Sequence, residues 1–389
     1  MSSNTSQAKQ DDVFYYDILI PFDPNFFRPA TYSVQLNQPL LDVPEDYYMS
    51  VIRASVPCQN VPIFVAKVLP FPNTNRNTLI YTVTLTYNGF SFTQNVVYQT
   101  TSFFTPIPPG PSASVPSGYS NDPYYYVYEY ANFLAMINTA YQAAFVGLGG
   151  LVVLPVGAVA PWFEYESDSQ RISLVAQIAF YDQALALPIG VYVNYHTFQF
   201  FDALPSNSYG NNLVNGQDFQ FIIRNQYNNW YTPSFLPSLV PPAVPAYYRM
   251  EQEYDALVNW TSLKTLSFVS SLLPVTLEYI PSAQDGNIGV LNSNGVVFSL
   301  EPFYEKGSEC RSLIQFQNPG EYQLINMHGR TTLNKVDISI FWGDVEGRQT
   351  LVLIPPGQSA TMKLMFIRKS LYKSMKEDGS WSGFCSTRR

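Results

Sequence analysis

The residues that could carry out acid–base or metal chemistry are few in this sequence. His196 and His328 are the two histidines among 389 residues, and each lies near the end of a segment that has the residue pattern of a strand. Neither has a cysteine or carboxylate at the spacing of a zinc site. A catalytic triad would need one of them as its base, and the chain has no G-x-S-x-G sequence to supply the nucleophile. We therefore expect both histidines to be structural.

Two groups of carboxylates lie close enough in sequence to act together. Glu164, Glu166 and Asp168 alternate along one segment, and Asp344 and Glu346 form a second pair. Paired carboxylates can hydrolyse a glycosidic bond or bind calcium. Alternation in a strand that ends in a turn is more typical of a solvated face, and neither group has the spacing of an EF-hand loop. The sequence thus predicts a protein that is not an enzyme and has no catalytic residue, cofactor or metal ligand.

The composition favours a sheet protein with a large core. Charged residues make up 13% of the chain, against about a quarter in an ordinary soluble domain. Aromatic residues make up 16%, with 29 tyrosines and 27 phenylalanines, and there are 30 prolines. So much apolar and aromatic content excludes intrinsic disorder, and the few charges and many prolines exclude long solvated helices. The net charge of −8 excludes nucleic-acid binding over the whole surface.

Strands with a period of two are the main pattern along the chain. They are rich in β-branched and aromatic residues and are bounded by Pro, Asn, Asp or Gly. The hairpin of two such strands around Asn88-Gly89 is the clearest, because Asn-Gly fits a type I′ turn. The predicted strands of the first part are Val13–Ile20, Tyr32–Leu36, Tyr47–Val56, Leu79–Tyr87, Phe90–Tyr98, Phe163–Tyr165, Ile172–Ile178, Ile189–Asn194 and Phe219–Ile223.

Two proline-rich stretches interrupt the strands. Residues 103–123 form a long loop, which we expect at the surface, and the segment 124–145 after it is predicted as a helix. Residues 225–247 contain prolines that cannot donate hydrogen bonds to a sheet, so they are predicted as a linker. Short strands resume after it: Leu263–Val269, Val275–Ile280, Val296–Leu300, Leu313–Gln317, Tyr322–Met327, Val336–Phe341, Thr350–Ile354 and Ala360–Ile367.

This pattern predicts an all-β protein with two antiparallel, jelly-roll-like β-sandwich domains. The N-terminal domain covers residues 12–224 and carries the helix 124–145 and the long Pro-rich loop. The C-terminal domain covers residues 248–368, after the linker 225–247. Residues 1–11 are predicted as a disordered arm and residues 369–389 as a basic tail.

Targeting signals are absent from the residue pattern. The N-terminal residues are polar, which does not fit a secretory signal. The most apolar stretch, Phe145–Pro161, is short and interrupted by glycine and proline, so no membrane span is predicted. Cys58, Cys310 and Cys385 are far apart, which fits a reducing compartment better than a disulfide framework.

Two sets of residues are candidates for contacts with partners. Tyrosine and tryptophan are favoured at protein interfaces because the ring buries area while its polar group stays paired. The basic residues at the C-terminus could meet nucleic acid, such as a genome, or the acidic surface of a neighbouring subunit. For the aromatic set, core packing or a solvated loop is an equal alternative. For the basic set, a solvated terminus is the favoured alternative. The sets are Tyr124, Tyr125, Tyr126, Trp230, Tyr231 and Tyr247, and Arg368, Lys369, Lys373, Lys376, Arg388 and Arg389.

Three segments carry a resemblance to a known group of proteins. Pro44–Phe64 reads PEDYYMSVIRASVPCQNVPIF, Asn259–Tyr279 reads NWTSLKTLSFVSSLLPVTLEY, and Gly320–Arg368 begins GEYQLINMHGR. This layout resembles minor capsid or penton-type structural proteins of small eukaryotic DNA viruses, in the polinton-like virus and virophage group. The resemblance covers roughly half of the chain and includes no catalytic motif.

The resemblance implies a virion structural protein, a capsid subunit that assembles through β-sandwich domains into an icosahedral shell. Its implied partners are copies of itself and other capsid proteins of the same virion. Its implied location is the virion, after assembly in the cytoplasm or nucleus of the host cell. A double jelly-roll major capsid protein is also compatible with the length.

A binding module is the main alternative class. A receptor- or carbohydrate-binding sandwich, such as a viral fibre or spike, would present Trp162 beside Glu164 and Glu166 as its platform. A glycoside hydrolase on a sandwich is a weaker alternative, and it would need two carboxyl groups facing each other across a cleft.

Overall fold

The structure is a computed structural model of the whole chain. It describes most of the residues between 12 and 377, and the three cysteines and the arm at residues 1–11 lie outside them. The described ranges are 12–57, 59–100, 107–108, 110–113, 123–166, 168–210, 212–224, 229–231, 247–254, 260, 263–275, 295–300, 313–317, 323–344 and 349–377.

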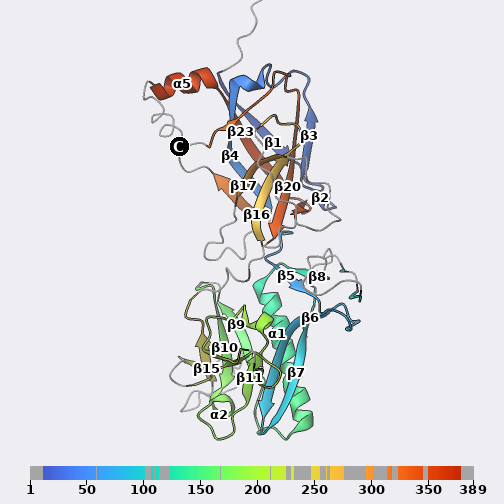
Figure 1. Ribbon diagram of the computed structural model, residues 1–389, viewed down its shortest axis with the longest axis vertical. Coiled ribbons are helices and arrows are strands. Elements are labelled where there is room, and N and C mark those ends of the chain that lie inside the picture. The colour runs from blue at the N-terminus through green and yellow to red at the C-terminus, as the bar shows by residue number, and fades with distance from the viewer. Residues whose placement is uncertain are drawn as a thin grey trace, which may run out of the picture. The chain divides into compact units, whose positions relative to one another are not determined.

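The chain forms two compact units that are interleaved along the sequence. Unit 1 comprises Met1–Val61, Leu263–Phe303 and Arg311–Arg389, and unit 2 comprises Pro62–Ser262 and Tyr304–Cys310. The colours of Figure 1 make this visible, because blue and red strands share one unit whereas the other is mostly green.

This division differs from the predicted one, in which domain 12–224 precedes domain 248–368. The strand at the N-terminus pairs with the last strand of the chain, so residues 12–61 complete the C-terminal sandwich. Residues 225–247, predicted as the linker, fall within the range of unit 2 and lie mostly outside the described residues. A reading of consecutive segments cannot detect such pairing, because the partners are more than 300 residues apart.

The first sheet of unit 1 alternates buried apolar and exposed polar residues. Its strand order is β1 (Val13–Ile20), β23 (Ala360–Arg368), β4 (Tyr47–Pro57) and β18 (Leu313–Gln317), and β19 (Ile325–Asn326) also pairs with β4. Every pairing is antiparallel. The inner face buries Ile18, Ile20, Met49, Leu364 and Phe366.

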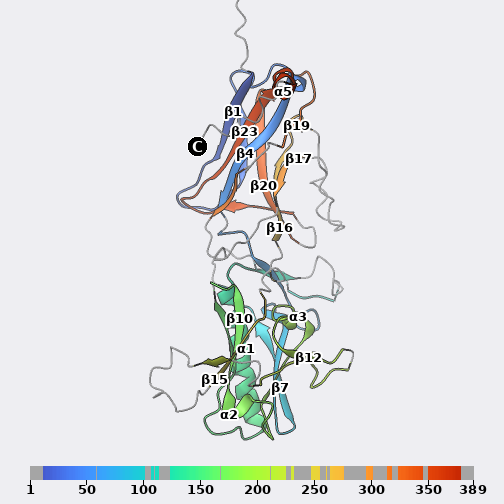
Figure 2. The same cartoon turned by 90° about the vertical axis from the view of Figure 1, so that its left-hand side faces the viewer.

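The second sheet of unit 1 is built around β20 (Lys335–Asp344). The order is β17 (Gly295–Leu300), β16 (Leu263–Ser270), β20 and β21 (Gln349–Leu351). The strand β3 (Thr31–Gln35) pairs with Lys335–Ser339 of β20, on the edge that also pairs with β21. A small sheet of β2 (Arg28–Pro29) and β22 (Leu353–Ile354) and a 3-10 turn at Pro44–Asp46 complete the unit, which Figure 2 shows from the side.

The described residues of unit 2 form three antiparallel sheets. The largest has the order β12 (Ser206–Ser208), β13 (Phe219–Phe221), β11 (Gly190–Val193), β6 (Thr78–Tyr87) and β7 (Phe90–Val97). The next has the order β14 (Asn229–Tyr231), β15 (Tyr247–Glu251), β10 (Arg171–Gln177) and β9 (Trp162–Glu166). The third pairs β5 (Phe64–Lys67) with β8 (Tyr124–Val127).

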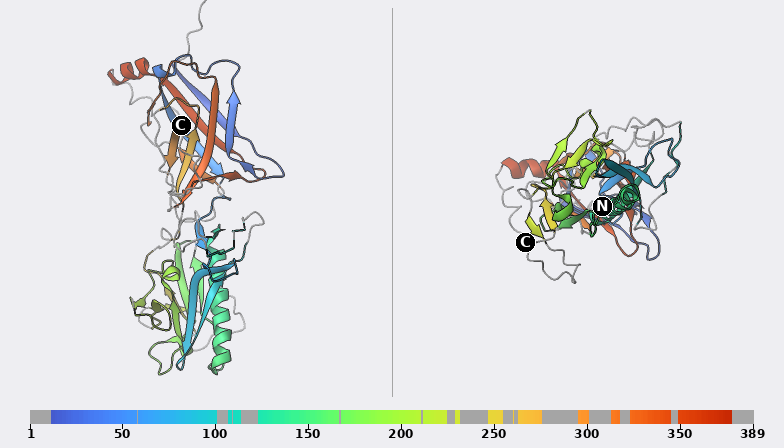
Figure 3. Two further views of the ribbon diagram at one scale, coloured as in Figure 1. Left: turned by 45° about the vertical axis from the view of Figure 1, so that its right-hand side comes forward. Right: turned by 90° about the horizontal axis from the view of Figure 1, so that it is seen from below.

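One long helix, α1 (Tyr130–Leu151), packs on β6, β7 and β9 of unit 2, as Figure 3 shows for β6 and β7. The predicted helix 124–145 begins too early, because Tyr124–Val127 pair with β5 as a strand. It also ends too early, because the helix continues through three glycines. By length and composition α1 could cross a membrane. One face of it, however, is buried in the core of unit 2 with spacings of three and four residues.

The hairpin predicted around Asn88-Gly89 is confirmed. Tyr87 pairs with Phe90, and φ is +50° at Asn88 and +81° at Gly89. Both central residues are therefore left-handed, as a type I′ turn requires. The prediction of a mostly β protein with several antiparallel sheets is also confirmed.

Three shorter helices complete the described residues. They are α2 (Ile178–Tyr181), α3 (Tyr195–Phe198) and α5 (Lys369–Glu377). The first residues of the predicted basic tail thus form a helix directly after β23, and the tail beyond Glu377 lies outside the described residues.

Candidate interaction surfaces

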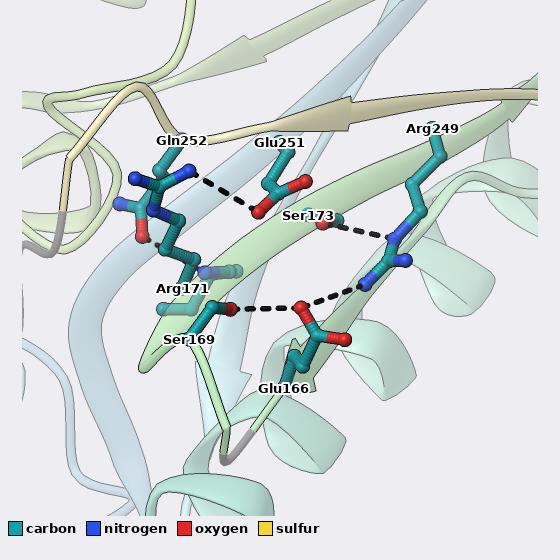
Figure 4. Close-up of polar contacts among 8 residues, drawn as sticks. Glu166, Ser169, Arg171, Ser173, Arg249, Glu251 and Gln252 are labelled. Carbon is teal, nitrogen blue, oxygen red and sulfur yellow. Dashed lines mark hydrogen bonds and ion pairs between the residues drawn. The ribbon is translucent and has the colours of Figure 1, made fainter. Parts of the chain in front are cut away.

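A cluster of paired charges covers one face of β9, β10 and β15 in unit 2 (Figure 4). Arg249 lies 3.8 Å from Glu166, and Arg171 lies 3.4 Å from Glu251. The hydroxyl of Ser169 donates to Glu166 at 2.8 Å. Residues two apart on a strand face the same side, which is why Arg249 and Glu251 share this face. Arg171 on β10 therefore has its carboxylate partner on the neighbouring strand β15, whereas Arg249 on β15 reaches across β10 to Glu166 on β9.

The carboxylates of this region are engaged within the fold. Glu164 accepts a hydrogen bond of 2.9 Å from the indole Nε1 of Trp162, and Glu166 has the partners given above. Asp344 is buried in unit 1, whereas Glu346 lies outside the described residues. Among the described residues no group of three His, Cys, Asp or Glu side chains could hold a metal ion. The cluster is a cross-strand structural network.

The two histidines lie in different units. His196 is in α3 of unit 2, and its pKa is lowered by partial burial and then by the positive charge of Lys67. His328 lies in unit 1, where its backbone N–H donates to Pro274 O at 2.8 Å.

A cavity of about 360 Å³ opens beside Trp162. Its lining is mostly apolar, and Tyr247 packs edge-on against Trp162 with ring centroids 5.4 Å apart. The amide of Asn138 is bonded to the backbone of Phe163 through both its nitrogen and its oxygen. The Asn138 amide is thus bonded within the fold, and Gln142 is the other amide in the lining. The lining residues are Asn138, Gln142, Val159, Ala160, Pro161, Trp162 and Tyr247.

The structure divides the predicted interface aromatics. Tyr125 is buried, stacks on Tyr98 with centroids 3.9 Å apart, and donates its hydroxyl to Asn77 at 2.6 Å. Tyr124 and Tyr126 are half-buried on the other face of β8. Tyr125 is therefore a core residue of unit 2.

The remaining predicted aromatics lie on β14 and β15. Tyr247 is buried against Trp162. Trp230 and Tyr231 lie in β14, and their side chains fall outside the described residues. Tyr247 is thus also a core residue.

The first two residues of the predicted electrostatic arm are anchored in unit 1. Arg368 bonds to Asp12 Oδ1 at 3.3 Å and to the Tyr47 hydroxyl at 3.2 Å. The ammonium group of Lys369 donates to the carbonyl oxygens of Glu45 at 2.6 Å and Met327 at 3.2 Å.

The rest of the arm is different. Lys373 is exposed on α5, and the side chains of Lys376, Arg388 and Arg389 lie outside the described residues. The prediction is therefore corrected for Arg368 and Lys369, because these two cations satisfy backbone and side-chain acceptors of unit 1. The electrostatic arm beyond Lys369 stays a prediction.

Replacing Lys369 by methionine is expected to lower the free energy of unfolding of unit 1 by about 1–3 kcal/mol, because two charge-assisted hydrogen bonds are lost. Lys373→Met on the same helix is the matched control, and we expect a change within about 0.5 kcal/mol for this exposed residue. Urea denaturation of both variants measures the difference. Equal stabilities would show that the Lys369 contacts contribute nothing.

A mixed polar and apolar surface that the sequence reading missed lies on the first sheet of unit 1. We call it the outer face and define it by Tyr15, Asp17, Leu19, Arg53 and Lys363. Tyr15 and Leu19 are exposed. Asp17 lies 3.8 Å from Arg53 and 3.5 Å from Lys363. The signal in the sequence was the alternation of Val13–Ile20, whose odd positions after residue 13 face away from the core.

Comparison with known proteins places the chain in a family. A family model described as Sputnik minor capsid protein V18/19 matches residues 14–368, which is most of the chain. The chain belongs to this family of minor capsid proteins. The chain is 40% identical over 216 residues to structural protein V19 of Sputnik virophage, covering 54% of this chain and 95% of V19. It is 43% identical over 166 residues to protein V18 of the same virus, covering 42% of this chain and 97% of V18.

Solved structures agree with the V18/19 assignment. A chain in the cryo-EM structure of Sputnik virophage is 40% identical, with a TM-score of 0.80 over 93% of this chain and 99% of that one. The mavirus penton protein has a TM-score of 0.59 over 92% of this chain and 100% of its own, at 13% identity, which shows a penton-like fold. The chain is thus a minor capsid structural protein of the virion, from a family of structural proteins and not of enzymes. This confirms the predicted function.

Proposed function

We propose that the protein assembles as a homo-oligomer of a penton-type capsid unit, and that unit 1 is a jelly roll that forms the contacts between copies. The observation that carries the proposal is the strand order of unit 1, together with the exposed outer face on its first sheet. Other capsid proteins of the virion would surround this oligomer, after assembly in the cytoplasm or nucleus of the host cell.

The strand order supports the jelly-roll assignment. Eight strands of unit 1, in chain order, are β1, β3, β4, β16, β17, β18, β20 and β23. The first sheet contains the first, eighth, third and sixth of them, and the second sheet contains the second, seventh, fourth and fifth. Two four-stranded sheets that exchange strands in this way form a jelly roll with two Greek keys.

Unit 2 then stands as an insertion between the third and fourth strands of the jelly roll. Its main segment, Pro62–Ser262, lies between β4 and β16 in the chain, and a short second segment, Tyr304–Cys310, lies between β17 and β18. Its largest sheet follows the order β12, β13, β11, β6 and β7, which differs from the order in either sheet of unit 1. One jelly roll with an inserted unit favours the minor capsid role over the double jelly-roll alternative.

The outer face of unit 1 has the chemistry of a contact between copies. Asp17 and Arg53 are exposed to 63% and 62% and carry opposite charges, so the surface has donors and acceptors for a neighbouring copy. Tyr15 and Leu19 add exposed apolar area between them. Mixed charge around apolar residues is the common composition of protein interfaces.

Purified protein is expected to form a discrete oligomer at micromolar concentration, with a mass that is a multiple of 44.0 kDa. Light scattering measures the mass, and negative-stain imaging shows the symmetry. The variant Tyr15→Asp/Leu19→Asp is expected to weaken self-association by about tenfold or more, because two apolar residues are replaced by unpaired charges.

Lys373, an exposed residue of α5 outside the outer face, supplies the control variant. Lys373→Glu is expected to leave the oligomer mass unchanged, since α5 lies outside the outer face. A wild-type protein that stays at 44.0 kDa at all concentrations would contradict the proposal. If the Tyr15→Asp/Leu19→Asp variant associates as strongly as the wild type, the copies do not contact one another through the outer face.

A further inference from the structure

One end of unit 2 presents apolar side chains to solvent, and no charged residue lies near them in the sequence. This apolar tip consists of Phe90, Val146, Leu151, Val153 and Val156, all of which are exposed. Val153 is exposed to 89% and Val156 to 97%. Figure 1 shows the end of α1, the β6–β7 turn and α2 together, at the opposite end of unit 2 from β5 and β8.

Hydrogen bonds within the loop and from Gln177 of β10 fix the conformation of the loop that carries Val153 and Val156. The N–H of Ala158 donates to Pro155 O at 3.1 Å, and Gly157 has φ +85°, so residues 155–158 form a type II turn. Val156 occupies the apex of this turn. The side-chain amide of Gln177 also bonds to Gly157 O at 3.0 Å and to Val159 N–H at 2.8 Å.

Further contacts join the loop to its neighbours. The Tyr181 hydroxyl of α2 donates to Val159 O at 2.7 Å. A Cβ added at Gly147 of α1 would overlap the Phe92 ring of β7, so the helix and the hairpin approach closely here. Phe90 lies two residues from Phe92 and faces the same side of the strand. The end of α1 with its loop, the β6–β7 hairpin and α2 are therefore adjacent at this end of unit 2.

The apolar side chains of this loop point in two directions. Val152, Leu154 and Ala158 pack against the core of unit 2. Val153 and Val156 point outward from the same backbone. The exposed valines are therefore not residues that failed to reach a core. The loop is anchored by one set of apolar side chains and presents another.

Charge is excluded from the sequence around the tip. No Asp, Glu, Lys, Arg or His occurs from residue 130 to residue 163, and none occurs from residue 77 to residue 121. These two ranges contain α1, its loop and the whole β6–β7 hairpin. In a chain with a net charge of −8, both segments that meet at the tip therefore lack charged residues along their whole length.

We propose that the apolar tip inserts into the outer layer of a lipid bilayer. Burying apolar side chains at the boundary between headgroups and acyl chains is favourable, and the segments that carry them, α1 with its loop and the β6–β7 hairpin, have no ion to desolvate. Asp182, which follows α2 at the same end, accepts the Tyr248 hydroxyl at 3.2 Å within the fold. A protein partner is less well matched, because protein interfaces rely on aromatic and arginine anchors with a polar rim. The tip has one aromatic residue and no cation, and its most exposed residues protrude singly from a turn.

The test is flotation of the full chain with phosphatidylcholine vesicles, which carry no net charge. Wild-type protein is expected to float with the vesicles equally at low and high salt, because the contact is apolar. Val153→Asp/Val156→Asp is expected to reduce the partition coefficient by about tenfold or more. Circular dichroism and thermal unfolding check that the variant is folded.

The matched control is Phe26→Asp/Leu213→Asp. These two apolar residues are also highly exposed, but they lie in other loops, and the variant adds the same charge. We expect it to float like the wild type. Equal loss in both variants would mean that added negative charge, not the tip, controls binding, and would overturn the proposal.

A second measurement reads the depth of insertion. In Val156→Trp the added indole is expected to shift its emission to the blue when vesicles are added, and brominated lipids are expected to quench it. Emission that does not change overturns the proposal. So does wild-type protein that fails to float, or that floats with anionic vesicles alone and detaches in salt.

The tip and the outer face of unit 1 are tested separately. Val153→Asp/Val156→Asp is expected to keep the oligomer mass of the wild type, and Tyr15→Asp/Leu19→Asp is expected to keep the ability to float. Loss of the oligomer in the tip variant, without any vesicle binding by the wild type, would identify a second copy as the occupant of the tip and would overturn the proposal.

Discussion

Trp260→Ala is expected to lower the free energy of unfolding of unit 2 by about 3–5 kcal/mol, the range for removing a fully buried large aromatic side chain. Trp260 is 0% exposed. Its indole Nε1 donates to Phe200 O at 2.9 Å. Alanine would remove the ring and this hydrogen bond together, and would leave a cavity that the surrounding rings cannot fill without moving.

The aromatic rings around Trp260 cannot close the cavity that alanine would leave without losing contacts with one another. Phe200 lies 4.6 Å from it between centroids, Tyr130 lies at 5.4 Å, and Phe133 lies at 5.7 Å. Tyr130 and Phe133 belong to the first turn of α1, so the indole fixes the start of that helix. Large planar groups that already contact one another in edge-to-face geometry have little freedom to close a gap.

Trp260→Phe is the matched control. It keeps an aromatic ring and removes the indole N–H, while Phe200 O retains a bond of 3.2 Å from the Gln252 side chain. We expect a loss of about 1–2 kcal/mol for this variant. Urea denaturation measures both losses, and hydrogen exchange locates them in unit 2. A loss below about 1 kcal/mol for alanine would show that the rings do repack.

The sequence predicts local structure of this protein better than its connectivity. The strand Val13–Ile20 is predicted with the bounds that it has in the structure, and so is Leu313–Gln317. Alternation along a strand reports the two faces of a sheet directly. It contains no information about which strand lies beside which, so the pairing of β1 with β23 was not predicted.

The sequence did not predict the role of a side chain where one residue type can serve two roles. Tyr125 and Tyr247 were candidates for an interface and are core residues, because a tyrosine that is buried and a tyrosine at an interface have the same local sequence. Arg368 and Lys369 look like the start of a basic tail. In the structure they bond to Asp12, Glu45 and Met327, which are distant in sequence. Only the fold brings these acceptors together.

The apolar segment Phe145–Pro161 shows that composition does not predict which side chains face solvent. Its composition, interrupted by glycine and proline, predicts no membrane span. In the structure the segment continues α1 and ends in a loop that faces solvent on one side and the core on the other. The exposure that makes the loop a candidate for contact with lipid depends on which valine points outward, and the sequence does not fix that direction.

Asp337→Ala is expected to lower the free energy of unfolding of unit 1 by about 2–3 kcal/mol, because a carboxylate that accepts several hydrogen bonds is removed and its donors lose their partner. The carboxylate of Asp337 in β20 accepts hydrogen bonds from the Ser270 hydroxyl at 2.5 Å and from the Ser271 hydroxyl at 2.6 Å. It also receives the backbone N–H groups of Ser271 and Leu272, each at 3.0 Å.

These bonds fix the chain where β16 ends. Ser270 is the last residue of β16 and is buried, and its hydroxyl oxygen also accepts the N–H of Leu273 at 2.9 Å. Asp337 therefore holds the turn after β16 against the adjacent strand. Asp17→Ala is the matched control, since Asp17 forms its ion pairs on the exposed outer face. We expect a loss below about 1 kcal/mol there.

The same carboxylate makes the stability of unit 1 depend on pH. Burial alone would raise the pKa of Asp337, but the hydrogen bonds from Ser270, Ser271 and Leu272 together lower it. A carboxyl whose pKa is depressed by folding stabilises the native state above its unfolded pKa of about 4. That contribution is lost as the pH falls through the lower native value.

Urea denaturation of wild type and Asp337→Asn should therefore give a stability difference that is constant from pH 7 to about pH 5 and shrinks below about pH 4. A difference that stays constant down to pH 3, or that grows there, would mean that the network does not favour the ionised carboxylate.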